Sequence, residues 1–426
     1  MQKQLILNKV SKGTILFVIQ MVKSVTGNEP GLLTTITLFM ANFAIWPTQL
    51  VITLFLIDIA EAFNSSPGVV GQVQTLSSAL AVVVALTMGV LTVRFTSRTL
   101  LIVGILFNGL SAIGCYLSTN FLGLLVSYAL SGVGAAVILP MNQTLVAELY
   151  PVEKRTGVLG LINAGITSSY MVGPPIANYV AEIGGWRAAF PWYVIPVTAV
   201  SLILAYRGLP NTGAPAVGET SDLSLLGGFR SVLSNRSAAW CLAAMGIMMF
   251  SWQFMSIYSI SYYRERFLIS TGMASMVLIV MSICTTSGNL ASGRVVGRLG
   301  RRTTAFISSI FVAVFLVVFP VVPNFWLSLA GRFLTGLAGP LVYTATSSLA
   351  LEMVPKFRGV MMALNSAAFQ MGTALGAALG GAMLLSYSYE TVGMVLGAFM
   401  LIPVFIYRYL IEDPEPQRGD SPTQAS

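Results

Sequence analysis

Arg332 is the single charged residue inside an otherwise uncharged part of the sequence, about two helical turns beyond Asn324. An arginine in an apolar environment needs an anion or a cluster of carbonyl groups as its partner. We therefore expect Arg332 to bind an anionic group of a substrate, or to pair with a carboxylate in a gating switch. The alternative is that its side chain extends back to the polar boundary of the helix.

Asp58 is the one acidic residue near the interior of a long apolar stretch, which makes it a candidate for carrying a proton. It follows Gln49 by nine residues, so the two side chains lie about 180° apart on a helix with about 100° per residue. Asp58 also lies close to Glu61, where the apolar stretch ends. This position favours a surface or interface role, with proton coupling as the alternative.

Catalytic, metal and cofactor chemistry has few candidate residues. The sequence has no histidine, and its cysteines, Cys115, Cys241 and Cys284, are far apart. This pattern argues against a zinc site, a disulfide framework or a redox pair. The sequence also lacks a phosphate-binding Gly-Lys-Ser/Thr loop and a nucleophile elbow. We expect neither an enzyme nor a bound metal or cofactor, and no direct use of ATP.

Polar and aromatic side chains recur at helical spacing within the apolar stretches. Such side chains are costly in hydrocarbon, so they tend to face a cavity or a partner helix. Hydrogen bonding between helices is the alternative to lining a cavity, and is common for serine, threonine and asparagine. The residues selected as cavity candidates are Asn42, Trp46, Gln49, Tyr128, Asn142, Tyr170, Trp252, Ser256, Arg332 and Tyr343.

The elements that carry these residues are those of a membrane protein. The chain has 426 residues, 55% hydrophobic and 9% charged, whereas a soluble domain has roughly 25% charged residues. A membrane-spanning helix needs about 20 apolar residues. We predict an all-α membrane protein with twelve such helices, one crossing Arg332 and two within 99–147. The uncharged stretches are 30–57, 62–93, 99–147, 156–181, 188–206, 237–263, 267–293, 303–331, 359–389 and 391–407.

The basic residues predict the orientation. The net charge is +8, and most lysines and arginines fall in alternate loops. Only Arg187, Arg264 and Arg266 fall in the opposite loops. Because cytoplasmic loops are rich in basic residues, both termini are predicted to be cytoplasmic. The charge therefore indicates membrane topology rather than nucleic-acid binding, and fits a prokaryotic plasma membrane.

The same divisions give the predicted domains. Residues 31–207 and 237–411 form two six-helix bundles, joined by a cytoplasmic linker at 208–236 that is rich in Gly, Pro and Ser. Residues 412–426 form a polar tail. Residues 1–30 form a cytoplasmic tail or an interfacial segment, or the start is over-extended and Met21 is the first residue. No cleavage site of a secretory signal follows.

The two halves repeat at a shift of 204 residues. Six identities at one shift, in matching topological places, indicate an internal duplication. A shift of six helices preserves orientation, so the repeat is parallel, as in one large transporter architecture. The matched pairs are Gly89 with Gly293, Arg94 with Arg298, Arg98 with Arg302, Gly132 with Gly336, Glu148 with Glu352, and Pro151 with Pro355.

Five segments carry a resemblance to a known family. Gly89 to Arg98, and the repeat copy Gly293 to Arg302, resemble a Gly-x-Leu-x-Asp-Arg-x-Gly-Arg-Arg loop. Glu148 to Arg155 resembles the loop after helix 4 of the same family, and Trp186 to Phe190 the outer loop before helix 6. Ala164 to Pro174 resembles the helix-5 signature of drug and metabolite antiporters. On these segments the chain is similar to the major facilitator superfamily along residues 31–411.

The resemblance implies gating residues on the cytoplasmic side, with one departure. The acidic residue that helps to latch the two halves in the family is Val93 here, and Gly297 in the second copy. A latch would then depend on arginines that meet helix ends or acids such as Glu148 and Glu352. The alternative is that these arginines only set the orientation of the helices in the membrane and have no role in gating. The predicted gating residues are Gly89, Arg94, Arg98, Gly293, Arg298, Arg301 and Arg302.

The resemblance also implies a central cavity lined by helices 1, 4, 7 and 10, which carry most of the cavity candidates. In helix 5, Pro174 after Gly173 should bend the helix. In helix 11, Gly372, Gly376 and Gly380 repeat every four residues and offer a groove for close helix approach.

The implied function is secondary transport of a small organic molecule by alternating access, by a monomer surrounded by membrane lipids. Efflux of amphipathic, drug-like compounds leads, because twenty methionines and an aromatic cavity suit adaptable binding. Uptake or exchange of an anionic metabolite held by Arg332 is the alternative, as is a lipid flippase. A non-transporting membrane receptor is the competing class.

Overall fold

A computed structural model of the chain describes residues 32–210, 230–354 and 357–413. All regular elements in these ranges are helical. The predicted tails and most of the predicted linker lie outside the described residues.

The first half contains α2 (Leu32–Phe43), α3 (Pro47–Leu54), α4 (Leu56–Ala62), α5 (Pro67–Val70), α6 (Gln72–Arg94), α7 (Ser97–Leu117), α8 (Phe121–Leu149), α9 (Val152–Ala189), the π-helix η1 (Phe190–Val194) and α10 (Ile195–Gly208). The second half contains α12 (Arg236–Phe267), α13 (Thr271–Leu299), α14 (Arg301–Val321), α15 (Phe325–Met353), α16 (Arg358–Met383), α17 (Tyr389–Phe399) and α18 (Leu401–Tyr409).

Ten segments in the described part of the chain are long and apolar enough to cross a membrane. One of them, Gly157–Gly208, is 52 residues long and contains a break, so it is long enough for two crossings. Helix α16 is not among the ten, yet its 26 residues run between those spans. Counted in this way, the described residues are compatible with the twelve crossings that the sequence predicts. The all-α membrane fold is confirmed by the ten spans.

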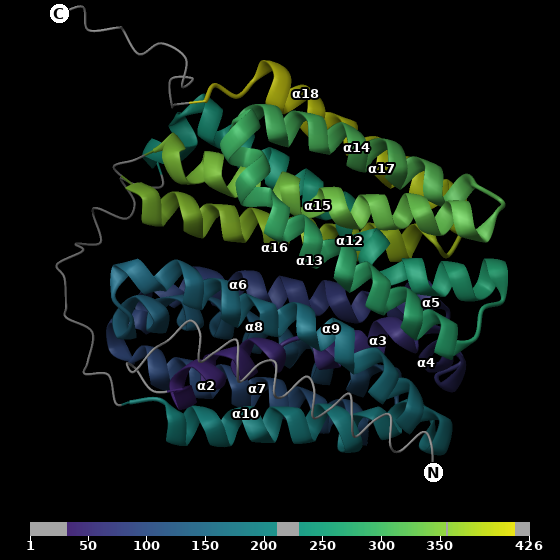
Figure 1. Cartoon of the computed structure of the whole chain (residues 1–426). Helices are drawn as coiled ribbons and strands as arrows, with labels where there is room; N and C mark the ends of the chain where they lie inside the picture. The colour runs from purple at the N-terminus through teal and green to yellow at the C-terminus, as the bar shows by residue number, and fades with distance from the viewer. Residues whose placement is uncertain (1–31, 211–229, 355–356, 414–426) are drawn as a thin grey trace, which may run out of the picture.

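The helices form two layers (Figure 1), with α2 to α10 below and α12 to α18 above in that view. Each layer is held by packing between neighbouring helices, such as α7 on α8 and α14 on α15. The layers meet where α6 packs along α16, α9 along α13, and α3 against α12. The predicted division at residues 31–207 and 237–411 stays a prediction at the level of its boundaries.

The first crossing is interrupted where the sequence predicts one uninterrupted helix. Helix α2 ends at Phe43 and α3 begins at Pro47. Proline has no backbone N–H and fits the first turn of a helix, so it starts a new helix here. The Asn108 side chain, from α7, donates a hydrogen bond of 2.9 Å to the Ala44 carbonyl in the gap. This contact satisfies a backbone acceptor that the interruption exposes.

The reversal between the fifth and sixth crossings lies inside α9. Gly184 and Gly185 have non-helical backbone angles, and Gly185 has a φ of +69°. A side chain is unfavourable at this φ, which glycine adopts freely. Helix α9 is otherwise regular through Gly173 and Pro174, so the predicted bend at Pro174 stays a prediction.

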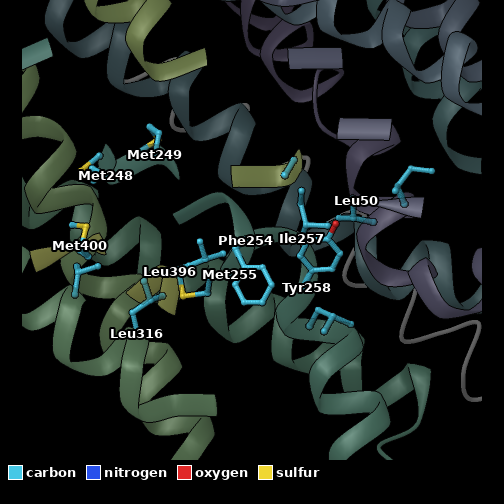
Figure 2. Packing of buried hydrophobic residues seen from close by; sticks show 14 of the residues in the cluster. Leu50, Met248, Met249, Phe254, Met255, Ile257, Tyr258, Leu316, Leu396 and Met400 are labelled. Atoms are coloured by element: carbon cyan, nitrogen blue, oxygen red, sulfur yellow. The ribbon is translucent and has the colours of Figure 1, made fainter. Parts of the chain in front are cut away.

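Methionines fill much of the buried face of α12. Met248, Met249 and Met255 belong to one buried cluster with Leu396 and Met400 of the last crossing. Figure 2 shows these side chains together, and Leu50 of α3 close to Tyr258 of α12. The buried cluster of the second half therefore includes residues of the first half where the two halves meet.

The glycines of α16 permit the closest helix contact in the second half. A Cβ atom at Gly372 would lie 2.1 Å from the Gly246 carbonyl oxygen, and one at Gly376 would lie 2.2 Å from the Phe250 carbonyl oxygen. Both oxygens belong to the backbone of α12, which cannot move aside as a side chain can. The groove predicted from the four-residue spacing therefore receives α12.

Gly376→Ala is expected to lower the melting temperature of the purified protein by several degrees. The added methyl would force α16 away from α12, and overpacking of this kind costs roughly 1–3 kcal/mol. Gly160→Ala is the matched control, because a Cβ at Gly160 has nothing within 4 Å. We expect that control to melt at or slightly above the wild-type temperature, as glycine is a poor helix former. Equal melting of both variants would contradict the packing argument.

Candidate functional site

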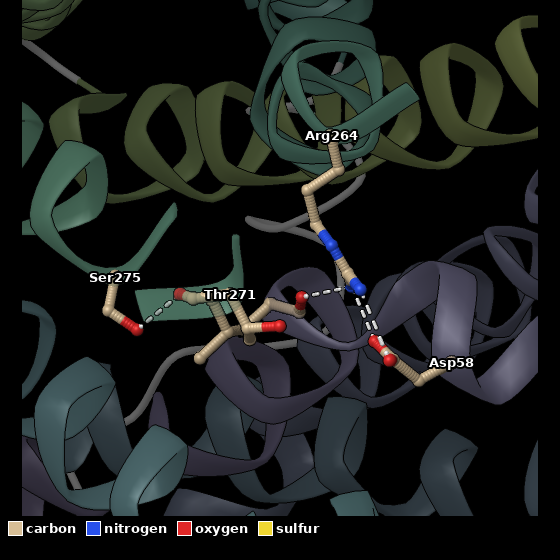
Figure 3. A network of polar contacts seen from close by, with 5 residues as sticks. Asp58, Arg264, Thr271 and Ser275 are labelled. Carbon is tan, nitrogen blue, oxygen red and sulfur yellow. Dashed lines mark hydrogen bonds and ion pairs between the residues drawn. The ribbon is translucent and has the colours of Figure 1, made fainter. Parts of the chain in front are cut away.

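An ion pair joins the two halves near one end of the bundle. Arg264, in the last turn of α12, forms a bidentate contact with Asp58 of α4, in which Nη2 lies 3.1 Å from Oδ1 and Nη1 contacts Oδ2 (Figure 3). Nη1 also lies 3.4 Å from the Leu54 carbonyl oxygen, at the end of α3. The side chains are 15% exposed for Arg264 and 36% exposed for Asp58. The ion pair thereby joins α4 to α12, although the two residues lie about 200 positions apart in the sequence.

Three further hydrogen bonds cross between the halves in the same region. The Gln72 side-chain amide donates to the Ala378 carbonyl at 2.9 Å, and the Tyr258 hydroxyl donates to the Gly68 carbonyl at 3.4 Å. The Ser275 hydroxyl lies 3.3 Å from the Pro174 carbonyl oxygen. We call the set of these residues the interhalf zone: Leu54, Asp58, Gly68, Gln72, Pro174, Tyr258, Arg264, Ser275, Ala378 and Gly381.

The backbones approach closely in this zone. A Cβ at Gly381 would lie 2.4 Å from the Gly68 carbonyl oxygen, and a Cβ at Gly68 would lie 2.5 Å from the Gly381 oxygen. Chain order places the zone at the end where α4 turns into α5 and α12 into α13. The opposite end carries the end of α10 and the start of α12. Five side-chain hydrogen bonds between the halves thus lie in the interhalf zone.

Asp58→Arg is expected to open the interhalf zone by placing two like charges together. A partly exposed pair contributes about 1 kcal/mol, or roughly a fivefold change in population. In a variant with Cys115, Cys241 and Cys284 replaced by serine, a cysteine at Ala378 should react with a membrane-impermeant maleimide several times faster.

The charge-swapped double variant, Asp58→Arg with Arg264→Asp, should return the labelling rate toward that of the parent. The matched control is Glu390→Arg, since Glu390 pairs with Arg266 at 3.6 Å within the second half. That control should leave the rate unchanged. Faster labelling in the control, or no recovery in the double variant, would contradict a role of the Asp58–Arg264 pair between the halves.

Asn42 and Asn142 form a buried amide network in the first half. Asn142 Nδ2 lies 2.6 Å from Asn42 Oδ1 and 3.1 Å from the Leu38 carbonyl oxygen, and Asn42 Nδ2 donates to the Ile162 carbonyl at 3.0 Å. Their exposed fractions are 1% and 0%. The network links α2, α8 and α9. In this structure these asparagines hold helices together, and their predicted place on a cavity wall stays a prediction.

The other candidates of the first half differ in how far they are covered. Trp46 and Gln49 are half-buried, and the Trp46 ring lies 5.8 Å from that of Tyr170 on α9. Tyr128 is buried, and its hydroxyl donates to Gln74 Oε1 of α6 at 2.7 Å. A Cβ at Gly173 would lie 2.4 Å from the Tyr193 hydroxyl, so Gly173 serves close packing.

In the second half, Arg332 is 2% exposed on α15. Its guanidinium carbon lies 5.9 Å from the centre of the Trp252 ring. A Cβ at Gly339 would lie 2.2 Å from the same indole, which shows that Trp252 lies directly against the α15 backbone. Ser256 is half-buried one turn further along α12. Tyr343 is 42% exposed, with its ring 5.8 Å from that of Phe369 on α16.

Two predicted gating arginines bind the last helix of their own half. Arg98 Nη2 contacts the Tyr206 carbonyl of α10, and Arg302 Nε donates to the Tyr407 carbonyl of α18 at 2.8 Å. These repeat-related arginines therefore meet helix C-termini, where cations are favourable. Glu148 accepts a hydrogen bond of 2.6 Å from Ser97, also within one half.

The remaining gating candidates lie at the same end of the molecule. Arg94 and Arg298 are exposed, and Arg301 and Arg302 are half-buried. Gly89 lies in α6, and a Cβ at Gly293 in α13 would meet nothing within 4 Å. The hydrogen bonds that Arg98, Arg302 and Glu148 make at this end lie within one half. The gating role of the candidates stays a prediction.

Sequence reasoning missed most of the interhalf zone. Gln72, Tyr258 and Ala378 had no distinguishing pattern. Arg264 had one available signal, because it is a basic residue in a loop on the side that is otherwise poor in basic residues. Gly381 directly follows the periodic glycines of α16, and beyond Tyr258 of α12 it also meets Gly68 and Gln72 of the first half. In the described part of the chain, no group of three or more metal-binding side chains is present.

This architecture is that of a membrane transport protein: two layers of spanning helices, joined at one end, with polar side chains inside. Residues 32–267 and 242–426 match the Major Facilitator Superfamily, and the chain belongs to this family.

Two relatives span nearly the whole chain. An uncharacterized MFS-type transporter, YwfA of Bacillus subtilis (strain 168), is 24% identical over 388 residues, which covers 88% of this chain and 92% of that protein. A probable sugar efflux transporter of Helicobacter pylori (strain P12) is 24% identical over 376 residues, which covers 87% and 93%.

Solved structures share the fold. The nucleoside transporter NupG superposes with a TM-score of 0.73 at 14% identity, covering 89% of this chain and 98% of that one. A D-xylose-proton symporter gives 0.74 at 14% identity, covering 89% and 97%. A bacterial homologue of the lysosomal transporter Spinster, in an inward-facing and unoccupied conformation, gives 0.64 at 14% identity, covering 88% and 94%.

Proposed function

We propose that this protein is a secondary transporter that exports a small amphipathic organic molecule by alternating access. The observation that carries the proposal is the one-sided contact between the halves. The interhalf zone joins them near the α4–α5 and α12–α13 turns, while the arginine-bearing loops at the other end bind within their own halves. Rocking about the region between these ends would open one side and close the other.

The positive-inside pattern supports the orientation. With both termini in the cytoplasm of a prokaryotic cell, the interhalf zone would face outward, and we infer that the opposite, arginine-bearing end opens toward the cytoplasm. A state of this kind accepts cargo from inside the cell, as export requires. The relative described as a probable sugar efflux transporter is consistent with this direction. We propose that the protein works as a monomer, with membrane lipids around it.

The aromatic character of the candidate cavity supports an amphipathic cargo. Trp46 and Tyr170 from the first half, and Trp252 from the second, are half-buried. Flat aromatic faces and flexible methionines accommodate apolar molecules of varied shape.

The test is cargo movement in proteoliposomes that contain the purified protein. A lipophilic cationic dye and a panel of neutral sugars and nucleosides would be loaded, with and without an imposed pH gradient. Saturable movement above that in protein-free liposomes supports the proposal, and dependence on the gradient indicates proton coupling, with Asp58 as the first carrier to examine. Absence of movement for every compound, in protein that is folded by its melting curve, would overturn the amphipathic-export proposal.

Exchange of an anionic metabolite is the second candidate, because Arg332 is a buried cation without an acidic partner among the described residues. Counterflow of radiolabelled carboxylates in the same liposomes would distinguish it from dye export.

A further inference from the structure

The last helix of the second half carries an exposed apolar stripe. Helix α18 lies at the outer edge of its layer, where it packs on α14 and α12 (Figure 1). Leu401, Phe405 and Tyr409 recur at four-residue spacing, so they share one face of this helix. Their exposed fractions are 53%, 56% and 67%, and the rings of Phe405 and Tyr409 lie 4.9 Å apart. Because α18 belongs to a candidate span, this stripe faces membrane lipid.

Two arginines from adjacent helices lie beside the end of the stripe. Arg302 of α14 donates from Nε to the Tyr407 carbonyl at 2.8 Å and from Nη2 to the Arg408 carbonyl. These bonds use two of its five N–H donors. Arg408 is exposed, and its guanidinium carbon lies 5.7 Å from the centre of the Tyr409 ring. Among the described residues, neither arginine forms an ion pair with a carboxylate, so both guanidinium groups keep donors for an external anion.

We propose that Arg302 and Arg408 bind the phosphate of an anionic phospholipid whose acyl chains lie along Leu401 and Phe405. Guanidinium groups match the geometry of phosphate oxygens, and basic pockets between spanning helices bind anionic headgroups. Tyrosine is enriched where a membrane meets water, so Tyr409 indicates that the two arginines lie at the depth of the phosphate. The site is on the outside of the second half, away from the candidate cavity.

The charge on this surface determines which lipid is preferred. Any phospholipid covers the apolar stripe equally well, so a preference must come from the two arginines. The nearest acids along the chain, Glu412 and Asp413, follow the end of α18. There the Glu412 N–H donates to Ser237 Oγ of α12 at 3.2 Å, so the chain turns away from the stripe toward α12. The surface that remains beside the stripe is cationic, which is complementary to an anionic headgroup.

The measurement is lipid binding to the purified protein in a neutral detergent, read by native mass spectrometry. Phosphatidylglycerol is compared with phosphatidylcholine of the same acyl chains. We expect phosphatidylglycerol to bind roughly 30-fold more tightly, since each of the two arginines contributes roughly a fivefold change. Glycerophosphoglycerol, the same headgroup without acyl chains, should not displace the bound lipid at equal concentration. Displacement would assign a soluble anion to the site and overturn the lipid proposal.

Two variants test the location. Arg408→Gln should lower the preference for phosphatidylglycerol roughly fivefold, and Arg302→Gln combined with Arg408→Gln should abolish it. Arg408 is exposed, so the single variant should melt like wild type even if the loss of the Arg302 hydrogen bonds unfolds the double variant. Arg294→Gln is the matched control, because Arg294 is an exposed arginine on α13, and it should keep the full preference.

Three results would overturn the proposal: equal binding of both lipids by the wild type, an unchanged preference in Arg408→Gln, or an equal loss in Arg294→Gln. The last result would mean that the lipid responds to the overall charge and not to this site. Because no step of the experiment requires transport, a negative result leaves the proposed function standing.

Discussion

Replacing Arg332 by methionine is expected to abolish transport while leaving the melting temperature unchanged or higher. The two effects have opposite signs because the residue is a buried cation without an ionic partner among the described residues. Removing one member of the buried charge pair that Arg332 would form with an anionic cargo costs roughly 2–5 kcal/mol of binding, which corresponds to roughly 30-fold or more in rate at low cargo concentration. In the unloaded protein, an apolar side chain of similar length removes an uncompensated charge, a change that is often neutral or stabilising.

The measurement combines the initial rate of transport in proteoliposomes with a melting curve of the same preparation. Arg266→Met is the matched control, because Arg266 is 53% exposed and its pair with Glu390 lies at the surface. Surface pairs contribute little, so we expect this control to transport and melt like wild type. A wild-type transport rate in Arg332→Met would eliminate the functional role of Arg332. A joint loss of transport and of folding would assign it to structure.

Cross-linking the interhalf zone is expected to stop transport reversibly. Gln72 and Ala378 are joined by a 2.9 Å hydrogen bond across the two halves. Cysteines at both positions, in a protein without Cys115, Cys241 and Cys284, should form a disulfide on oxidation and hold this end shut. Because alternating access requires both ends to open in turn, transport should fall to the protein-free background and recover after reduction.

The control cross-link lies within one half. The Ser77 and Ser131 hydroxyls, from α6 and α8, are 3.3 Å apart. A cysteine pair at these positions ties two helices that belong to the same layer and move together. Its oxidation should leave transport at more than half the reduced rate. Continued transport in the oxidised Gln72–Ala378 pair, with the disulfide verified by mass, would rule out opening of this end as part of the cycle.

Some properties follow from the sequence because they depend on local composition. Membrane insertion depends on the length and polarity of each stretch, so the uncharged runs predict the helices well. The predictions made from the positions of proline and glycine differed in outcome. The α16 glycines pack against α12 as the four-residue spacing suggests, whereas the break at Pro47 was missed because no charged residue interrupts the stretch 30–57 around it.

The candidate site shows more clearly what sequence patterns do not predict, namely which helices lie against one another. Helical spacing groups Asn42 with polar residues of its own stretch, but it does not reveal which helix lies opposite. The answer in the structure is α8 and its Asn142. Arg98 and Arg302 were matched by the repeat, yet only packing shows that each contacts the last helix of its own half.

The sequence alone determined that the chain is an all-helical membrane protein, since hydropathy and charge follow from local composition, and it predicted an internal repeat and an arginine inside one of the helices. The tertiary structure decided that Asp58 pairs with Arg264, and that Arg332 has no acidic partner among the described residues. Both results depend on the rotation and depth of helices that are distant in sequence. Those quantities are set by packing of the whole bundle, and no local pattern specifies them.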